Sequence, residues 1–139
     1  MKAVVIYNTR SGNTKELGGK LKEVLEKYNH ECDIFRDKEI KKTPEVVKDY
    51  DFLCVGSPVH AGGPAIFPFR GLLKKISKLD LDGKRLVSFS TSSGVNAWKK
   101  VCKSIKKRLP NLDYVDSVGC VKKENEEAIK SFETIIKNL

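Results

Sequence analysis

Long hydrophobic runs are missing from this sequence. No stretch approaches the roughly 18 consecutive apolar residues that a membrane-spanning helix needs. The short apolar run that follows Met1 and Lys2 is also too brief for a secretory leader, and no cleavage site follows it. We therefore expect a cytoplasmic protein that does not insert into a membrane.

Cysteine motifs are also missing. The four cysteines are far apart, without a Cys-x-x-Cys pair and without a histidine at metal-ligand spacing. Cys54, Cys102 and Cys120 fall in apolar segments, where free cysteine behaves mainly as a small hydrophobic residue. We expect these three and Cys32 to be buried, reduced and inert, and we expect no metal site.

Two nucleotide-binding motifs do not occur. The sequence contains neither the Gly-x-x-x-x-Gly-Lys-Ser/Thr loop for triphosphates nor the Gly-x-Gly-x-x-Gly turn for dinucleotides. Residues 8–14, which follow the first apolar run, include no cysteine, and this argues against a phosphatase that uses a thiolate. No apolar run at residues 3–7 or 52–55 ends in a carboxylate, so a phospho-acceptor aspartate is missing as well.

Acidic residues are few relative to basic ones. The 139 residues include 27 Lys and Arg against 18 Asp and Glu, which gives a formal net charge of +9. The basic residues are densest between Lys99 and Arg108. This run is either a solvated helix face or a docking surface for an acidic protein. Nucleic-acid binding is disfavoured, because no aromatic side chains interleave with the lysines.

Strand and helix patterns alternate along the whole chain, without a linker or a repeat. The patterns predict strands at 3–7, 31–36, 52–55, 85–89 and 112–121, and helices at 13–28, 43–48, 64–77, 95–109 and 124–139. This alternation predicts one α/β domain over residues 1–139, with a five-stranded parallel sheet in a three-layer, doubly wound arrangement. The second and fifth strands carry acidic residues, as is typical of edge strands. The predicted strand order is therefore 2-1-3-4-5, with a ligand crevice beyond the carboxyl ends of strands 1 and 3.

Three segments of small residues follow the first, third and fourth predicted strands. Residues 8–14 combine hydroxyl and amide side chains with one glycine, directly before a helix whose N-terminus favours a phosphate. Residues 56–64 have little side-chain bulk and can lay peptide groups against a planar heterocycle, and residues 90–96 can hydrogen-bond to a ring edge. Together they predict a site for a phosphate and a ring. The alternative for residues 8–14 is a turn that merely caps the helix.

Residues 9–14, Thr-Arg-Ser-Gly-Asn-Thr, resemble the Thr/Ser-x-Thr/Ser-Gly-x-Thr loop with which the flavodoxin family holds the phosphate of FMN. The resemblance covers essentially the whole chain, and the uninterrupted fifth strand is similar to that of short-chain members. It implies a flavodoxin-like fold with one bound FMN. The implied contacts are Thr9, Arg10, Ser11, Gly12, Asn13 and Thr14 at the phosphate, Pro58, Val59, His60, Ala61 and Gly62 beside the ring, and Thr91, Ser92, Ser93 and Gly94 at its pyrimidine end.

The loops depart from the family in two respects. Many flavodoxins sandwich the flavin between aromatic side chains, but His60 provides the only ring in these loops, and we interpret nearby Trp98 as a core residue. Aromatic stacking contributes on the order of 1–3 kcal/mol, so we expect FMN to bind less tightly than is typical. The loops also contain no Asp or Glu. Arg10 and the net positive charge should favour the anion of reduced flavin, and we expect a less negative second reduction potential.

The resemblance implies an electron carrier that exchanges electrons with redox partner proteins, and the basic surface favours acidic ones. Two alternatives stay open. The first is an FMN-dependent reductase that uses NADH or NADPH to reduce quinones or other small acceptors. The second is a binding module of the same fold that has lost FMN. No catalytic side chain is predicted in any of the three cases.

Overall fold

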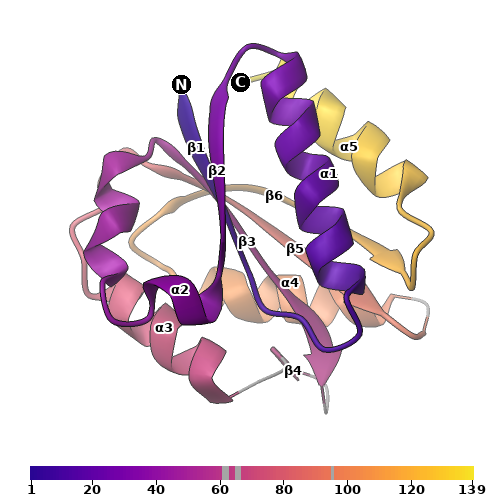
Figure 1. The fold of residues 1–139 in the computed structure, drawn as a ribbon, viewed down its shortest axis with the longest axis horizontal. Helices are drawn as coiled ribbons and strands as arrows, with labels where there is room; N and C mark the ends of the chain where they lie inside the picture. Colours follow the sequence, from indigo (N-terminus) through magenta and orange to yellow (C-terminus); the bar gives the residue numbers. More distant parts are fainter. Residues whose placement is uncertain (61–62, 65–66, 95) are drawn as a thin grey trace.

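Five parallel strands form the central sheet in the order β2-β1-β3-β5-β6 (Figure 1). They are β1 (Lys2–Tyr7), β2 (Glu31–Arg36), β3 (Phe52–His60), β5 (Arg85–Ser92) and β6 (Asp113–Val121). The two-residue strand β4 (Gly63–Pro64) pairs antiparallel with the end of β3. Because β5 and β6 are the fourth and fifth parallel strands, the predicted order 2-1-3-4-5 is confirmed.

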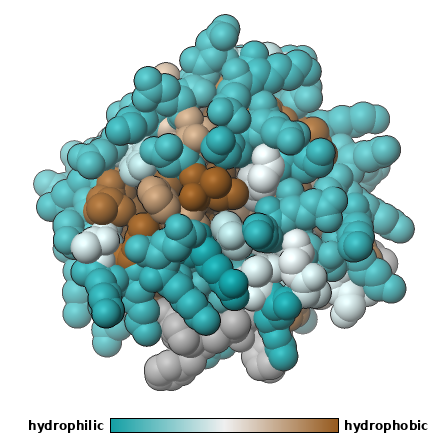
Figure 2. Space-filling view, viewed as in Figure 1, coloured by the Kyte–Doolittle hydropathy of each residue, from teal (hydrophilic) through white to brown (hydrophobic). Residues whose placement is uncertain are grey.

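This computed structural model spans residues 1–139. It describes all of them except residues 61, 62, 65, 66 and 95, and it describes no side chain from 60 to 68. Hydrophilic side chains cover most of the face shown in Figure 2, and the largest group of hydrophobic ones lies left of its centre.

Helices cover both faces of the sheet (Figure 1). Helices α1 (Asn13–Lys27) and α5 (Glu126–Lys137) pack on one face. On the other face lie α2 (Asp37–Ile40), the 3₁₀ helix η1 (Pro44–Asp49), α3 (Phe67–Ser77) and α4 (Ala97–Arg108). The predicted three-layer, doubly wound architecture is thus confirmed.

The alternation of side chains along β1 explains why the first strand reads as an unbroken apolar run. Ala3 and Val5 belong to the core beneath α1 and α5, whereas Val4 and Ile6 belong to the core beneath α3 and α4. All four are completely buried, and complete burial of a Val or Ile side chain stabilises the fold by roughly 1.5–3 kcal/mol. A strand that is covered on both faces is therefore rich in apolar residues along most of its length. Strands β2 and β6, which lie at the edges, are partly exposed as predicted.

Strands β3 and β5 are longer than predicted. Strand β3 continues to His60 and β5 continues to Ser92, so the beginnings of two predicted loops are extended and paired. The Ser90 hydroxyl donates a hydrogen bond of 2.6 Å to the Ser57 carbonyl, and both residues are completely buried. The apolar pattern ends before the strand pairing does, because Ser57 and Ser90, near the end of the pairing, are small, polar and buried.

All four cysteines are free and buried, as predicted. Burial raises the pKa of the Cys32 and Cys102 thiols to about 12 and that of the Cys120 thiol to about 11. Burial also places the pKa of the Cys54 thiol well above its ordinary value. The thiolate, which is the reactive form, is therefore scarce at neutral pH at every cysteine. In the part of the chain that the structure describes, no helix has both the length and the apolar character for crossing a membrane.

Candidate functional site

The carboxyl ends of the central strands surround a cavity of about 180 Å³. Its described walls come from all three predicted loops and from the residue that follows β6. They consist of Arg10, Ser11 and Asn13, Pro58 and Val59, Thr91, Ser92 and Ser93, and Lys122. Residues from distant parts of the sequence thus meet where the sequence predicts a ligand crevice.

Other predicted residues lie beside the cavity or outside the described part of the chain. Thr9 is buried and accepts a hydrogen bond of 3.0 Å at its Oγ1 from the Gly12 N–H. The Gly94 carbonyl accepts a hydrogen bond of 2.6 Å from the Ser92 hydroxyl, which shapes the third loop. The predicted residues Ala61 and Gly62 and the side chain of His60 lie outside the described residues.

The first loop presents a bare helix N-terminus. Gly12 is the N-cap of α1, with a φ of 94° in the left-handed region that favours glycine. The first hydrogen bond of the helix runs from the Glu16 N–H to the Gly12 carbonyl, and no described side chain caps the helix. The backbone N–H groups of the first turn and the positive end of the helix dipole are therefore available to an anion.

Three hydrogen bonds hold the first loop against its neighbours. The hydroxyl groups of Thr14 and Thr91 meet at 2.8 Å and join the first turn of α1 to the end of β5. Asn8 donates from its backbone N–H to the Gly56 carbonyl at 3.0 Å and from its side chain to Asp37 Oδ2 at 3.1 Å. These contacts fix the ends of β1, β3 and β5 relative to one another.

Sequence reasoning missed Asp37, which supports the site from the beginning of α2. Its side chain is 2% exposed, although it carries a carboxylate. The available signal was an acidic residue directly after the second predicted strand. The carboxyl end of that strand adjoins the carboxyl end of the first strand. Asp37 binds Asn8 and does not line the cavity.

Sequence reasoning also missed Lys122, which follows β6 and lines the cavity. Its φ is 53°, a left-handed conformation, and its N–H donates a hydrogen bond of 2.7 Å to the Ser92 carbonyl. This bond draws the lysine toward the third loop. The signal was its place after the fifth predicted strand, whose carboxyl end adjoins that of the fourth.

The described cavity walls are positively charged. Arg10 and Lys122 are both exposed at the cavity, and the described lining includes no carboxylate, thiol or aromatic ring. The lining also includes the hydroxyl groups of Ser11, Thr91, Ser92 and Ser93 and the amide of Asn13. Within the described residues, no group of three or more His, Cys, Asp or Glu side chains is placed to hold a metal ion. The arrangement is suited to binding an anionic, polar ligand.

Trp98 does not reach this cavity. The indole is half-buried and lies on Gly119 of β6, where the Cβ of any larger residue would overlap the ring. It lines a separate hollow together with Cys120 and Glu124. Trp98 therefore packs over the edge strand, which agrees only in part with the interpretation as a core residue.

The similar sequences are those of flavodoxins, and the similar solved structures include flavodoxins, a flavodiiron protein and an NADH:FMN oxidoreductase. Two curated relatives from Bacillus subtilis (strain 168) each match 104 residues: Probable flavodoxin 1 at 21% identity and Probable flavodoxin 2 at 26%. The match covers 75% of this chain, but only 63% of the first relative and 67% of the second. No family model matches the chain. A solved short-chain flavodoxin associated with a bacterial microcompartment has a TM-score of 0.86 at 16% identity, over 100% of this chain and 96% of that one. The fold is flavodoxin-like.

Proposed function

We propose that this chain, whose fold and sequence relatives support the flavodoxin family, binds one FMN in the crevice and carries electrons between redox partners. The observation that carries the proposal is the cavity itself. It brings the uncapped N-terminus of α1 together with two apolar residues at the end of β3, with small polar residues at the end of β5 and with two cationic side chains.

The phosphate end of FMN fits the first loop. The N–H groups of the first turn of α1 would bind its oxygens, together with the side chains of Ser11, Asn13 and Thr14. A hydroxyl has only one proton, so the Thr14–Thr91 pair uses one of its two protons internally. If Thr91 donates within the pair, Thr14 keeps its proton for the phosphate. Arg10 and Lys122 would balance the charge of the dianion.

The ring of the flavin fits the other two loops. Pro58 and Val59 would flank it from the end of β3, and Thr91, Ser92 and Ser93 would hydrogen-bond to its pyrimidine end. The proposed ring contacts also include His60, Ala61, Gly62 and Gly94. The described cavity is smaller than the roughly 300–1,000 Å³ of pockets that enclose a whole drug-sized ligand. Part of the ring would therefore stay at the surface, where electrons can pass to a partner.

The bound FMN would supply the redox chemistry, and the protein would supply binding, orientation and electrostatics. Arg10 and Lys122 face the cavity without a carboxylate among the described lining residues. Positive charge near the flavin stabilises its reduced anion. We therefore propose a second reduction potential that is less negative than in acidic flavodoxins. We also propose that the protein acts in the cytoplasm and exchanges electrons with partner proteins.

A titration with FMN tests the proposal. Binding should quench flavin fluorescence with a stoichiometry of one FMN per chain. Ser11→Ala should weaken FMN binding about 10-fold, because a hydrogen bond to a charged group contributes roughly 1.5–3 kcal/mol. Ser131→Ala, on the exposed face of α5, is the matched control and should bind FMN as the wild type does.

The same preparation distinguishes the open alternatives. An absence of quenching at saturating FMN would contradict the proposal and favour a binding module that has lost the cofactor. Sustained oxidation of NADH with a quinone as acceptor, by the FMN-loaded protein alone, would favour a reductase.

A further inference from the structure

The entire formal net charge of the chain lies on two neighbouring helices. Helices α3 and α4 contain nine of the 27 basic residues and no acidic residue. The other 18 basic residues are matched by the 18 acidic ones, so the rest of the chain is neutral. Both helices pack on the same face of the sheet (Figure 1). Their apolar stripes hold them there, and the basic side chains project away from that core.

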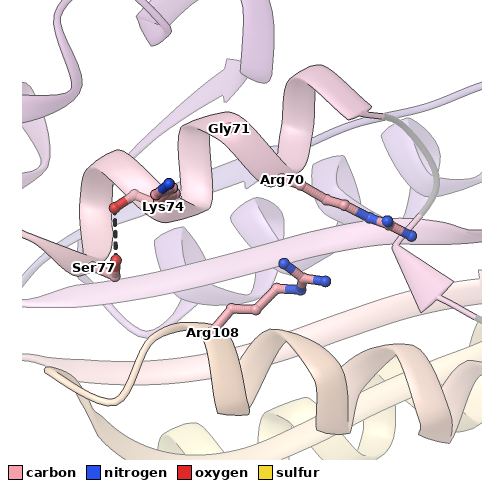
Figure 3. Close-up of a pocket in the computed structure, with 5 residues that line it drawn as sticks. All are labelled: Arg70, Gly71, Lys74, Ser77 and Arg108. Atoms are coloured by element: carbon pink, nitrogen blue, oxygen red, sulfur yellow. Dashed lines mark hydrogen bonds between the residues drawn. The ribbon is translucent and has the colours of Figure 1, made fainter.

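A groove of about 410 Å³ lies along these helices (Figure 3). Its lining consists of Arg70, Gly71, Lys74 and Ser77 from α3 and Arg108 from α4. In Figure 3 the guanidinium groups of Arg70 and Arg108 extend from the two helices into the space between them. Gly71 leaves the wall open, since no atom lies within 4 Å of where its Cβ would stand. The lining residues include three cationic side chains and no carboxylate.

We propose that this groove is the docking site for a carboxylate-rich surface of an acidic redox partner protein. The proposal rests on the proposed function of the chain as an electron carrier. A guanidinium group binds a carboxylate through two parallel hydrogen bonds, and arginine is one of the side chains that most often dominates binding energy at interfaces. The groove has room for Asp or Glu side chains of a partner. Among its described lining residues there is no aromatic side chain on which a nucleic-acid base could stack.

The Arg70 end of the groove lies toward the proposed flavin site. Arg70 is in the first turn of α3, and β4, which precedes that helix, pairs with Val59 at the end of β3. Val59 lines the crevice. A protein interface covers about 800 Å² on each partner, so a partner seated on the groove would also reach the mouth of the crevice. The binding energy would come from the groove, and the electron would pass at the crevice.

The test compares two pairs of substitutions with the same change in charge. Lys74→Gln/Arg108→Gln removes two charges from the groove, and Lys130→Gln/Lys137→Gln removes two from α5 on the opposite face. All four side chains are exposed. Arg108 and Lys137 each lie in the last turn of a helix, so the loss of favourable helix-dipole interaction is similar in both variants.

The probe is a plant-type [2Fe–2S] ferredoxin with a net negative charge, and its affinity is measured by calorimetry at low and high salt. At low salt we expect the groove variant to bind at least about 10-fold more weakly than the wild type and the α5 variant to lose about 2-fold or less, because only the groove charges would pair directly with carboxylates of the partner. Equal losses in the two variants would overturn the proposal. Failure of the wild type to bind the ferredoxin would overturn it as well.

Two further measurements separate this proposal from others. A 20-base-pair DNA duplex or vesicles of phosphatidylglycerol that bind more tightly than the ferredoxin, and lose affinity in the groove variant, would show that the partner class is wrong. An FMN titration of the wild type tests the proposed function independently, because calorimetry with ferredoxin does not require a flavin. Both variants should bind FMN as the wild type does, since neither pair lies at the cavity.

Discussion

Replacing Thr14 with valine removes one of the two hydroxyl groups that meet at 2.8 Å between α1 and β5. Valine has the same branched shape as threonine, so the change removes the hydrogen bond and leaves the side-chain volume nearly unchanged. Thr14 is 1% exposed and Thr91 is 3% exposed, so water cannot easily replace the missing partner. The hydroxyl of Thr91, which is largely buried, then loses its partner.

The expected magnitude follows from this burial. A buried polar group that loses its partner costs about 1–3 kcal/mol, whereas a hydrogen bond contributes a net 0.5–1.5 kcal/mol or so when both partners are removed together. Thr14→Val and Thr91→Val should therefore each lower the free energy of unfolding by about 1–3 kcal/mol. The double variant should lose less than the sum of the single variants, because it strands no hydroxyl.

The two single variants should differ in cofactor binding. If the Thr14 hydroxyl donates to the phosphate, Thr14→Val should weaken FMN binding about 10-fold or more and leave the affinity for riboflavin, which lacks the phosphate, nearly unchanged. Thr91 lines the cavity at the proposed ring site, so Thr91→Val should weaken the binding of both ligands. Riboflavin thus separates contact with the phosphate from support of the loop.

Urea denaturation of the apoproteins, followed through Trp98 fluorescence, measures the stabilities, and quenching of flavin fluorescence measures the affinities. Thr134→Val on α5 is the control, since its hydroxyl bonds to the Lys130 carbonyl at an exposed site. It should change the free energy of unfolding by no more than about 0.5 kcal/mol. Strict additivity of Thr14→Val and Thr91→Val would refute the buried hydrogen bond. An equal loss of FMN and riboflavin affinity in Thr14→Val would refute the phosphate contact.

Three other predictions follow from the same site and core. Gly56→Ala would place a Cβ against the buried ring of Phe89 and should destabilise the protein by about 1–3 kcal/mol in urea, whereas Gly19→Ala in α1, with open space around it, should stabilise it by about 0.5–1 kcal/mol. Lys122→Gln should weaken FMN binding and make the second reduction potential more negative in a potentiometric titration, and an unchanged potential would exclude the lysine from the flavin's surroundings. Cys32 has a pKa raised to about 12 in the folded state, so the unfolded state loses this proton first and stability should fall as the pH rises from 9 toward 12. At pH 8 a thiol reagent should react with Cys32 only after denaturant is added.

The architecture could be predicted because the burial of each strand leaves a direct trace in the sequence. Strands β1, β3 and β5 have helices on both faces, and each contains consecutive buried apolar residues near its beginning. Strands β2 and β6 have a free edge, and acidic residues such as Asp33 and Asp116 occur there. The position of each strand in the sheet could therefore be inferred from its polarity, without knowledge of any contact.

The elements that were missed are those whose burial comes from neighbours and not from their own hydrophobicity. Ser57 and Ser90 are completely buried, yet serine is typical of loops, so the pattern placed the ends of β3 and β5 too early. Helix α2 has four residues, which is too short for a helical period. Strand β4 has two residues, which is too few for a sequence pattern, and it is recognised by its pairing with Val59 and His60.

In the candidate site, too, some features could be predicted from the sequence and others could not. The three loops could be located because each directly follows a strand, and topology alone brings the carboxyl ends of neighbouring parallel strands together. The Thr14–Thr91 contact joins residues 77 positions apart, and its existence depends on the register of β5 and the start of α1. Lys122 lines the cavity and has a left-handed backbone conformation. Lysine does not favour this conformation, so the residue type could not predict it. Contacts of this kind require the three-dimensional structure.

The placement of charge on α4 is difficult to explain by folding alone. Basic residues in the last turn of a helix, here Lys106, Lys107 and Arg108, interact favourably with the negative end of its dipole. Lys99 and Lys100 lie at the opposite end, near the N-terminus, where a positive charge is unfavourable and where α4 has no acidic residue. Each such lysine opposes the helix dipole by a few tenths of a kcal/mol or so. A solvated helix face would be more stable with acidic residues at these positions. The proposed acidic partner would account for both lysines, and Lys99 also gains a contact of 5.7 Å between its Nζ and the centroid of the Trp98 ring.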